Sequence, residues 1–411
     1  MDALKRPKSG GVVIRSLPTD DVTFVVGDTN IETRPLPPFN DTVCAFLNAL
    51  SAYLMSNTAT KEFPDVMTFA FWCRKGHIQK LKSEFSSGPD RLGRGLALHI
   101  APSNVPVNFA FSYAFGLLSG NANVVRIASN ETAQVKIICD AINHVMDDPK
   151  YSDIRSMTAM VNYPADNAIT AKFSALSDAR IIWGGDQTIA SIRSLETSPR
   201  CVDIAFADRT SICVMDITAL ETATDVTLSR LAQGFYNDTY LMDQNACSSP
   251  HLIVWHGENA ETARSKFWST LENLVTKAYT LEAIQAIDKY TATLQTALDV
   301  DEADYITQHG INVVRVNLTD LPKQLENTRG QFGLFFEHTT NDLGPLAKAI
   351  SPKFQTMTYF GMDKSELTKF VIDGRLRGID RIVPVGRGLA IDVMWDGYDV
   401  VKHLSRVVAV E

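Results

Sequence analysis

The sequence lacks the features that mark secreted, metal-bound or nucleic-acid-binding proteins. Its six cysteines form no C-x-x-C pair and have no zinc-like spacing to histidine, so we expect reduced thiols and no structural metal. The first residues lack an apolar signal core, and the longest apolar stretch, residues 105–118, is too short to span a bilayer. The 39 basic and 47 acidic residues form no dense basic patch, which argues against a nucleic-acid partner. These absences predict a soluble, cytoplasmic protein.

A further absence is the G-x-G-x-x-G fingerprint, so that motif gives no support for an ordinary dinucleotide-binding fold. The 411 residues exceed one ordinary core, and two or more domains are expected. Strand-like and helix-like segments alternate, which is typical of a mainly parallel sheet with helices on both faces. The expected strands are residues 95–101, 123–128, 156–161 and 179–183, with helices at 106–118 and 132–146.

The second half of the chain continues this α/β pattern. A helix at residues 222–235 leads to a polar loop at 243–249, and a strand at 251–255 follows directly. Two long amphipathic helices are expected at 260–279 and 281–298.

Cys247 differs from the other cysteines because small and polar residues surround it in the loop between a helix and a strand. Cys44, Cys73, Cys139 and Cys213 lie in apolar runs, where a thiol behaves as a small hydrophobic group. A polar loop exposes a thiol and offers backbone N–H groups that stabilise a thiolate. Cys247 is therefore a candidate nucleophile, with a plain structural cysteine as the alternative.

Two further candidates follow strands, where ligands of parallel sheets bind. Asn104 comes after the strand at 95–101, and its carboxamide could donate a hydrogen bond to an oxyanion. The alternative for Asn104 is a helix-cap or turn residue. Gly184 and Gly185 end the strand at 179–183 and let a phosphate or ring approach a helix N-terminus.

These features, in this order, resemble the aldehyde dehydrogenase superfamily, and within it the acyl-CoA (fatty acid) reductase family of the bacterial luminescence type. Residues 99–130 resemble the superfamily's oxyanion loop and the strand that ends at the cofactor ribose. Gln244-Asn245-Ala246-Cys247 resembles its nucleophile loop, and Ile182-Trp183-Gly184-Gly185 resembles its cofactor turn. The segments that indicate the reductase branch are Gln355-Thr356, Tyr359-Phe360-Gly361, Arg381 to Gly388 and Trp395 to Tyr398.

The resemblance implies an α/β, aldehyde-dehydrogenase-like fold: a Rossmann-type cofactor domain, an α/β catalytic domain and a small β oligomerisation arm. Residues 1–40 are then N-terminal strands or an arm, and 41–211 are the cofactor-binding domain. Residues 212–380 are the catalytic domain, and 381–411 return to the cofactor domain or the arm. A homo-oligomer, either a dimer or a tetramer, is expected.

The resemblance also implies the chemistry. Cys247 attacks an acyl carbonyl, Asn104 and the Cys247 backbone N–H hold the oxyanion, and a nicotinamide cofactor reduces the thioester to an aldehyde. The acyl donor is an acyl-CoA or a carrier-bound thioester, and an acyl-activating synthetase is an expected partner protein. The implied cofactor-binding residues are Ser103, Arg126, Ser129, Gly184, Gly185 and, at the ribose, Glu337.

Two departures from the superfamily pattern refine this prediction. Ser129 stands where NAD-preferring members carry a glutamate, and Arg126 is nearby, so NADPH is favoured over NADH unless the alignment slips toward Glu131. Residues 202–208 lack the glutamate that activates water in aldehyde oxidisers, so hydrolysis of the thioester should be slow. Asp203 could still serve as a base. The acyl-to-aldehyde direction is favoured.

Two other functions stay open at this stage. The chain could be a short-chain CoA-acylating aldehyde dehydrogenase or an acyl-phosphate reductase, which the identity of the acyl donor would separate. It could also be a catalytically silent scaffold that binds a nucleotide, although Cys247, Asn104 and the glycine pair together favour an enzyme.

Overall fold

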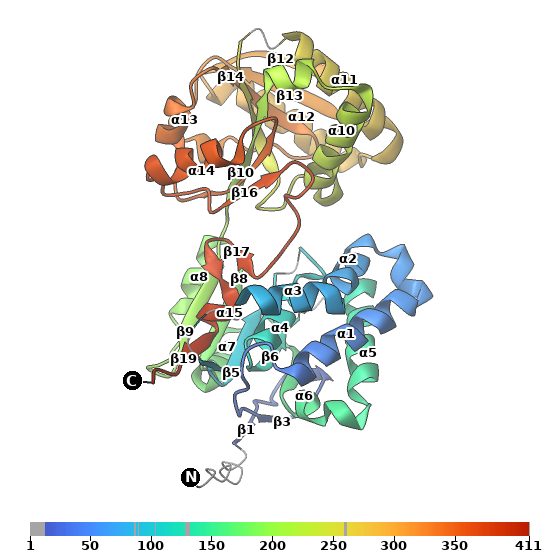
Figure 1. The fold of residues 1–411 in the computed structure, drawn as a ribbon, viewed down its shortest axis with the longest axis vertical. Helices are drawn as coiled ribbons and strands as arrows, with labels where there is room; N and C mark the ends of the chain where they lie inside the picture. The colour runs from blue at the N-terminus through green and yellow to red at the C-terminus, as the bar shows by residue number, and fades with distance from the viewer. Residues whose placement is uncertain are drawn as a thin grey trace. The chain divides into compact units, whose positions relative to one another are not determined.

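The computed structural model describes residues 13–85, 88, 90–102, 104–127, 132–258 and 261–410. The chain divides into two compact units (Figure 1). Unit 1 comprises Met1–Ala207 and Tyr398–Glu411, and unit 2 comprises Asp208–Gly397. Each unit is a sheet covered by helices.

Within its described residues, unit 1 is built on a six-stranded sheet in the order β2-β7-β6-β5-β8-β9. Its strands are β2 (Thr23–Val26), β5 (Leu96–Ile100), β6 (Ala122–Arg126), β7 (Thr158–Asn162), β8 (Ala179–Trp183) and β9 (Val202–Phe206). All neighbouring strands are parallel except β2, which runs antiparallel to β7. The strand order reverses between β5 and β8, and ligands of doubly wound sheets bind beyond the carboxyl ends at such a switch point.

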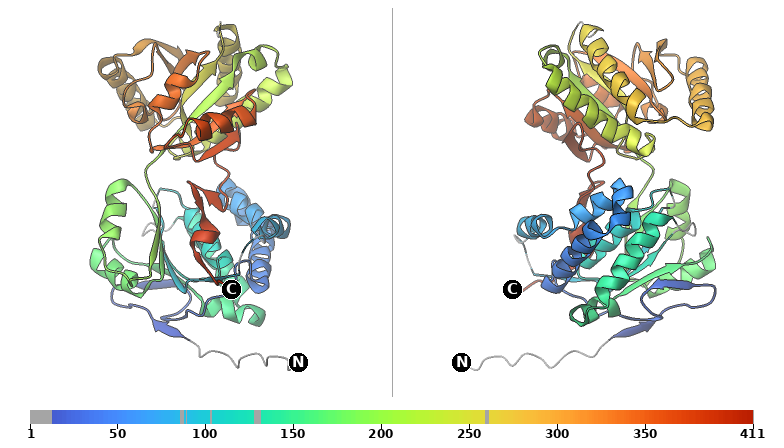
Figure 2. Two further views of the ribbon diagram at one scale, coloured as in Figure 1. Left: turned by 60° about the vertical axis from the view of Figure 1, so that its left-hand side comes forward. Right: turned by 90° about the vertical axis from the view of Figure 1, so that its right-hand side faces the viewer.

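Helices cover both faces of this sheet (Figure 2). Along β5, Leu96, Leu98 and Ile100 pack with Phe173 on one side, whereas His99 bonds to a helix residue on the other. This period of two is that of a strand buried on both faces. The helices of unit 1 are α1 (Asp41–Ser56), η1 (Thr58–Glu62), α2 (Pro64–Trp72), α3 (Lys75–Phe85), α4 (Asn108–Leu118), α5 (Ala133–Met146), η2 (Pro149–Tyr151), α6 (Ser152–Ser156), α7 (Asn167–Leu176), α8 (Asp186–Arg193) and α15 (Val400–His403).

Short strands at both ends of the chain complete unit 1. β1 (Ile14–Ser16) pairs with β3 (Asn30–Glu32), and β4 (Arg91–Gly93) pairs with β19 (Ser405–Val407), each antiparallel. The N-terminal strands are not all separate from the main sheet, because β2 joins its edge.

Unit 2 contains, among its described residues, a seven-stranded sheet in the order β12-β13-β14-β11-β10-β15-β16. The strands are β10 (Thr210–Asp216), β11 (Pro250–His256), β12 (Ala303–His309), β13 (Val313–Leu318), β14 (Leu334–Thr340), β15 (Phe354–Phe360) and β16 (Arg381–Pro384). Neighbours are parallel except β12, which is antiparallel to β13. The register of β10 shifts at Ser211 against both of its neighbours.

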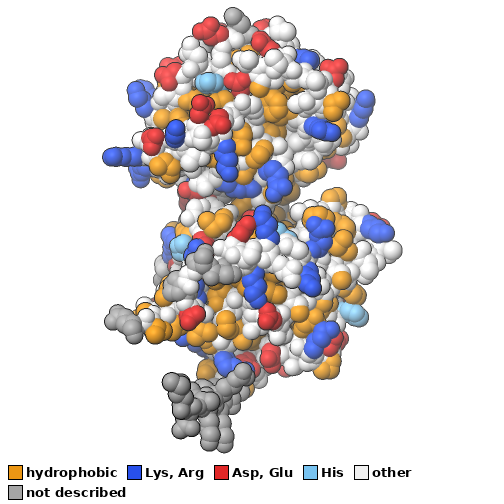
Figure 3. All heavy atoms as spheres, in the orientation of Figure 1, with side chains coloured by type: hydrophobic (Ala, Val, Ile, Leu, Met, Phe, Trp, Pro, Cys, Tyr) orange, Lys and Arg blue, Asp and Glu red, His pale blue; other side chains and the backbone are white. Residues whose placement is uncertain are grey.

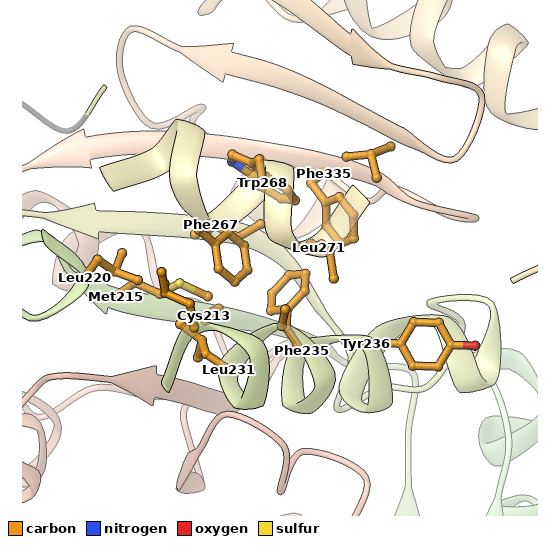
Figure 4. Close-up of a cluster of buried hydrophobic side chains, with 14 of the residues drawn as sticks. Cys213, Met215, Leu220, Leu231, Phe235, Tyr236, Phe267, Trp268, Leu271 and Phe335 are labelled. Carbon is orange, nitrogen blue, oxygen red and sulfur yellow. The ribbon is translucent and has the colours of Figure 1, made fainter. Parts of the chain in front are cut away.

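Alternate side chains of this sheet pack into two hydrophobic cores, one on each face. Cys213, Met215 and Trp255 face one core, and Ile212 and Val214 face the other. Figure 4 shows the first core, in which the Phe235 and Phe267 rings lie 5.4 Å apart, edge to face. The remaining elements are α9 (Ile217–Glu221), α10 (Asp225–Thr239), η3 (Tyr240–Met242), α11 (Glu261–Ala278), α12 (Ala283–Asp299), η4 (Leu325–Asn327), α13 (Gly344–Ala349), α14 (Lys364–Asp373), β17 (Met394–Trp395) and β18 (Tyr398–Asp399).

The expected elements are present, with shifted ends. The helix expected at 222–235 is α10, which starts at Asp225 because the Thr224 hydroxyl accepts the Thr227 N–H and caps it. The domain boundaries also differ from those expected. Unit 2 begins at Asp208, not 212, and extends to Gly397, because residues 381–384 form the edge strand β16 of its sheet.

The surface gives two plain findings. Every helix among the described residues is too short or too polar to cross a bilayer. On the face of each unit drawn in Figure 3, acidic and basic side chains are interspersed.

Candidate active site

Cys247 lies in the loop between η3 and β11, at the amino end of the unit 2 sheet. Asp243 and Gln244, which open this loop, both have left-handed backbone conformations with φ of 51° and 63°. Left-handed conformations are costly for residues other than glycine and persist only where surrounding contacts impose them. The loop is therefore held in a specific shape from outside.

Gln244 supplies much of this support. Its side chain is 1% exposed. The amide nitrogen donates to the carbonyls of Pro250 at 3.2 Å and Leu334 at 3.0 Å, and the amide oxygen accepts the Gly333 N–H at 3.1 Å. A buried amide with its hydrogen bonds satisfied on both atoms fixes the loop to two strands.

The Cys247 peptide is held by Ser211. The Ser211 hydroxyl donates to the Cys247 carbonyl at 2.7 Å and accepts the Thr356 N–H at 3.1 Å. Ser211 is 1% exposed and sits at the register shift of β10. Such bulges are frequent next to active sites, where they redirect a side chain.

The Cys247 thiol is half-buried, and burial raises its pKa. The backbone N–H of Arg209 and the Arg329 guanidinium lower the pKa, whereas the carboxylates of Asp208 and Asp396 raise it. The structure thus corrects two expectations. The thiol is less exposed than the polar loop suggested, and its backbone donor comes from Arg209, outside the loop. Burial, the largest of these influences, thus favours the protonated thiol over the thiolate.

An ion-pair network fixes Arg209. Its guanidinium binds Asp396 at 2.8 Å and Asp380 at 2.5 Å, and it donates to the Phe354 carbonyl at 2.6 Å. The Gln355 amide also donates to Asp396, at 2.9 Å. Gln355 and Asp396 lie in two of the segments that resemble the reductase branch, and Asp396 binds the side chain of Arg209, whose N–H contacts the Cys247 thiol.

The segment from Arg381 to Gly388 is hydrogen-bonded to α10. The buried Asp238 carboxylate accepts the N–H groups of Gly386 at 2.6 Å and Gly388 at 2.7 Å. Burial raises the pKa of Asp238 to about 6, and these N–H groups act in the opposite direction. Arg381 donates to the carbonyls of Arg387, Gly388 and Ala390. This segment therefore supports α10 at Asp238, whose carbonyl accepts the Ser249 hydroxyl of the Cys247 loop at 2.7 Å.

In unit 1, the predicted residues gather at the carboxyl ends of the strands next to the switch point. Gly184 and Gly185 follow β8, and a Cβ added at Gly185 would meet no heavy atom within 4 Å. Asn104 follows β5 and is exposed. It is not the cap of α4, because Val107 occupies that position. Ser103 lies outside the described residues, so the structure does not place it.

Arg126 ends β6 and lies over Tyr163. Its guanidinium carbon is 4.7 Å from the ring centroid, and it donates to the Tyr163 carbonyl at 3.3 Å. Its buried Nε has no hydrogen-bond partner among the described residues. Ser129 and Glu131, on which the NADPH prediction also depends, lie outside the described part of the chain.

Comparison with known proteins identifies the family. The family model "Acyl-CoA reductase (LuxC)" matches residues 77–407, which include Asn104, Arg126 and Cys247. The chain belongs to the LuxC acyl-CoA reductase family.

Curated relatives of this family are similar over part of their length. A long-chain acyl-protein thioester reductase of Vibrio harveyi is 26% identical over 175 residues, which are 42% of this chain and 34% of that protein. A protein of the same name from Photorhabdus laumondii is 25% identical over 171 residues, 41% of this chain and 33% of its own length. The match thus spans about a third of these relatives.

Solved structures confirm the predicted fold. An NAD-dependent benzaldehyde dehydrogenase from Corynebacterium glutamicum aligns with a TM-score of 0.59 and 12% identity, covering 95% of both chains. A 1-pyrroline-5-carboxylate dehydrogenase from Thermus thermophilus aligns with a TM-score of 0.60 and 12% identity, covering 91% of this chain and 81% of that one. The fold is that of an aldehyde dehydrogenase.

Glu337 has surroundings that differ from those predicted for a ribose ligand. It is 1% exposed, and its carboxylate binds Arg264 from α11 and Arg315 from β13, the latter at 3.3 Å. A buried carboxylate shared by two guanidinium groups is a structural ion pair. Glu337 is therefore not part of the cofactor site proposed below.

Asp203, which the sequence left open as a water-activating base, forms an ion pair with Arg180. Its two oxygens accept from Nε and from a terminal nitrogen of Arg180, both at 2.8 Å. Arg180 is 2% exposed. Both carboxylate oxygens are thus occupied by a buried arginine and are not free to accept a proton from water.

Sequence reasoning missed Arg209, Ser211 and Asp238. Each supports Cys247 or its loop through contacts between residues far apart along the chain, so no local spacing reveals them. The sequence did offer one signal for Asp238. The residue lies on the buried face of a helix, and a carboxylate buried there needs hydrogen-bond or charged partners. Among the described residues, no group of three or more His, Cys, Asp or Glu side chains could hold a metal ion.

Proposed function

We propose that the chain reduces an activated acyl group to an aldehyde through a thioester on Cys247, with unit 1 binding the cofactor and unit 2 carrying the nucleophile. One observation carries this proposal. Cys247 is held at its carbonyl by Ser211 and at its thiol by the Arg209 N–H, and Asp396 binds the Arg209 guanidinium.

The reaction has two half-steps. The Cys247 thiol loses its proton and attacks the acyl carbonyl carbon, and the carrier leaves as a thiol that takes up a proton. When bound, a reduced nicotinamide supplies hydride to the acyl carbon of this thioester. Cleavage of the carbon–sulfur bond then frees the aldehyde and returns the Cys247 thiolate. By resemblance, the Asn104 amide and the Cys247 N–H stabilise the oxyanion.

The Asp203–Arg180 pair supports reduction over hydrolysis. A thioester is hydrolysed quickly only when a positioned base activates water. The β9 strand carries no glutamate, and its Asp203 carboxylate is bound by Arg180 on both oxygens. The acyl-enzyme therefore persists long enough for reduction.

We further propose NADPH as the preferred cofactor. The open space in front of Gly185 at the start of α8 suits a phosphate or a ring. The Arg126 guanidinium at the end of β6 has an unpartnered buried Nε and suits a 2′-phosphate. Ser103 and Ser129 complete this cofactor site in the proposal.

The acyl donor we propose is an acyl-CoA or an acyl thioester carried by a protein, delivered by an acyl-activating synthetase. The curated relatives are named for acyl-protein thioesters. A homo-oligomer remains part of the proposal by resemblance to the superfamily.

Intact-protein mass spectrometry with a panel of acyl-CoAs tests the proposal. We expect an acyl adduct on the wild-type chain that is absent in Cys247→Ala and disappears as NADPH is consumed. Cys201→Ala is the matched control and should retain the adduct. An adduct that persists in Cys247→Ala, or that is hydrolysed at the same rate without NADPH, would contradict the proposal.

A further inference from the structure

Two left-handed turns lie against each other at the start of the Cys247 loop. The first is Asp243–Gln244, and the second is Phe332–Gly333, with φ of 57° and 87°. The Phe332 N–H donates to the Asp243 carbonyl at 3.2 Å, and the Gly333 N–H donates to the Gln244 side chain at 3.1 Å. The shape of the nucleophile loop therefore depends on the second turn.

Side chains next to and within α12 hold both turns. The Tyr279 hydroxyl donates to one Asp243 carboxylate oxygen at 2.6 Å, and the Gln285 amide donates to the other at 3.3 Å. The Lys289 ammonium donates to the Phe332 carbonyl at 2.9 Å and also to the Ile311 carbonyl. Gln285 and Lys289 are four residues apart and share one face of α12.

Lys289 is an unusual residue for this position. It is 4% exposed, and burial lowers its pKa to about 8. Burying an ammonium costs more than burying an apolar chain of similar length, and two carbonyl acceptors offset only part of that cost. An apolar residue would serve the packing of α12 alone, so the ammonium is better explained by its hold on the Phe332 turn.

We propose that Tyr279, Gln285 and Lys289 are positioning residues for Cys247. They fix the Asp243–Gln244 turn and thereby keep the thiol half-buried against the Arg209 N–H. This inference rests on the proposed role of Cys247 as the nucleophile. It makes α12 the helix that sets the reactivity of the thiol without touching the reacting atoms.

The test measures alkylation of Cys247 by iodoacetamide in the whole chain, without acyl donor or cofactor, across a pH series, with peptide mass spectrometry as the readout. The variants are Tyr279→Phe, Gln285→Leu and Lys289→Met, studied at temperatures where circular dichroism shows them folded. Loss of one of these side-chain hydrogen bonds should let the Cys247 loop move. The thiol should then be less buried, and burial is what raises its pKa. We expect the pH midpoint to fall and the rate near neutral pH to rise about fivefold.

Two controls distinguish a change in the Cys247 loop from general unfolding and from an unrelated effect of altering α12. Cys213, fully buried in the core of the same unit, should stay unlabelled, because its labelling would report unfolding instead of a freed loop. Tyr290→Phe and Gln295→Leu, on the exposed face of α12, should leave the Cys247 profile unchanged.

A Cys247 profile that is the same in Tyr279→Phe and Gln285→Leu as in the wild type would overturn the inference. Tyr279→Phe removes one hydrogen bond, whereas Gln285→Leu removes the bond to Asp243 and also the capping bond that the Gln285 oxygen accepts from the Glu282 N–H. Tyr279→Phe therefore carries the test even where the other variants fail to fold. The alkylation readout is independent of acyl transfer. Failure of the proposed function, seen as no acyl adduct, is thus distinguishable from failure of this inference.

Discussion

Ser211 and Arg209 illustrate how single residues act on Cys247 from outside its loop. Ser211 joins the Cys247 carbonyl to the Thr356 N–H, and Arg209 presents its backbone N–H to the thiol. Neither residue is a nucleophile, acid or base. Their effect is to fix the direction of a thiol whose pKa is raised by burial, and orientation of a reacting group strongly affects rate.

Replacement of Ser211 by alanine should slow acylation of Cys247. The change leaves the Cys247 carbonyl and the buried Thr356 N–H without their partner, which costs about 1–3 kcal/mol of stability. We expect the acyl adduct to form about tenfold more slowly, measured by time-resolved mass spectrometry at a temperature where the variant is folded. Thr358→Val is the control, since the Thr358 hydroxyl donates to the Ile212 carbonyl, at 3.4 Å, and bonds to the Cys213 thiol in the core. Equal effects in both variants would contradict this role for Ser211.

Replacement of Arg126 by glutamine should change cofactor preference. In the proposed cofactor site the Arg126 guanidinium binds the 2′-phosphate, so its loss should remove charge-assisted hydrogen bonds and raise KM for NADPH about tenfold or more. KM for NADH should change little, because NADH lacks that phosphate. Steady-state kinetics with both cofactors measures the ratio, and Arg155→Gln, an exposed arginine of the same unit, is the control. A parallel rise for both cofactors would rule out the 2′-phosphate contact.

At the scale of elements, β14 and its neighbours share one buried ion pair. Glu337 on β14 joins Arg264 of α11 to Arg315 of β13. The Arg315 guanidinium also lies 5.4 Å from the Trp268 ring of α11. The carboxylate therefore connects one helix and two strands of unit 2.

Glu337→Gln should destabilise unit 2 without affecting cofactor binding. Removal of the carboxylate leaves two buried guanidinium groups without their anion, which costs about 3–5 kcal/mol. Thermal unfolding should report a lower Tm, whereas the dissociation constant of NADPH, measured on folded protein, should stay within twofold of the wild-type value. A large loss of NADPH affinity with an unchanged Tm would restore the ribose-binding role that the sequence suggested.

Helices and strands could be predicted from the sequence where the pattern of apolar and turn-forming residues within the segment determines them. The strand at 179–183 coincides with β8, because a short, mostly apolar segment that ends at two glycines is typical of a buried strand. The left-handed turn at Asp243 and Gln244 was not predictable, because no glycine marks it and distant contacts impose it. The ion pairs of Glu337 were not predictable either, because a polar residue near a strand end looks the same in the sequence whether a ligand or two distant arginines bind it.

At the scale of the whole molecule, buried titratable groups with large pKa shifts contribute to the response of stability to acid. Burial lowers the pKa of His99 and of His251 to about 4 each, and burial raises the pKa of Asp238 to about 6. Unfolding returns the histidines to about 6.5 and the carboxyl to about 3.9. Between pH 4 and 6.5 the histidines favour unfolding as pH falls, whereas Asp238 opposes them only in unit 2.

We therefore expect Tm to fall as pH is lowered from about 6.5 to 4, because the unfolded chain binds more protons across that window. Unit 1 should be more sensitive, since it holds His99 without the opposing Asp238. Differential scanning calorimetry of the wild type and His99→Gln measures this, and the variant should lose about 3 kcal/mol of the pH dependence at most. A variant with the same slope as the wild type would show that His99 does not control it.

The division of the chain has a consequence for biosynthesis. Unit 2 is one continuous segment, Asp208–Gly397, placed between the two parts of unit 1. A ribosome therefore releases every strand of the Cys247 sheet before it makes β19, which pairs with β4 to complete unit 1. Domains generally fold as units during synthesis. Unit 2 should thus be able to fold before the final residues of the chain complete unit 1.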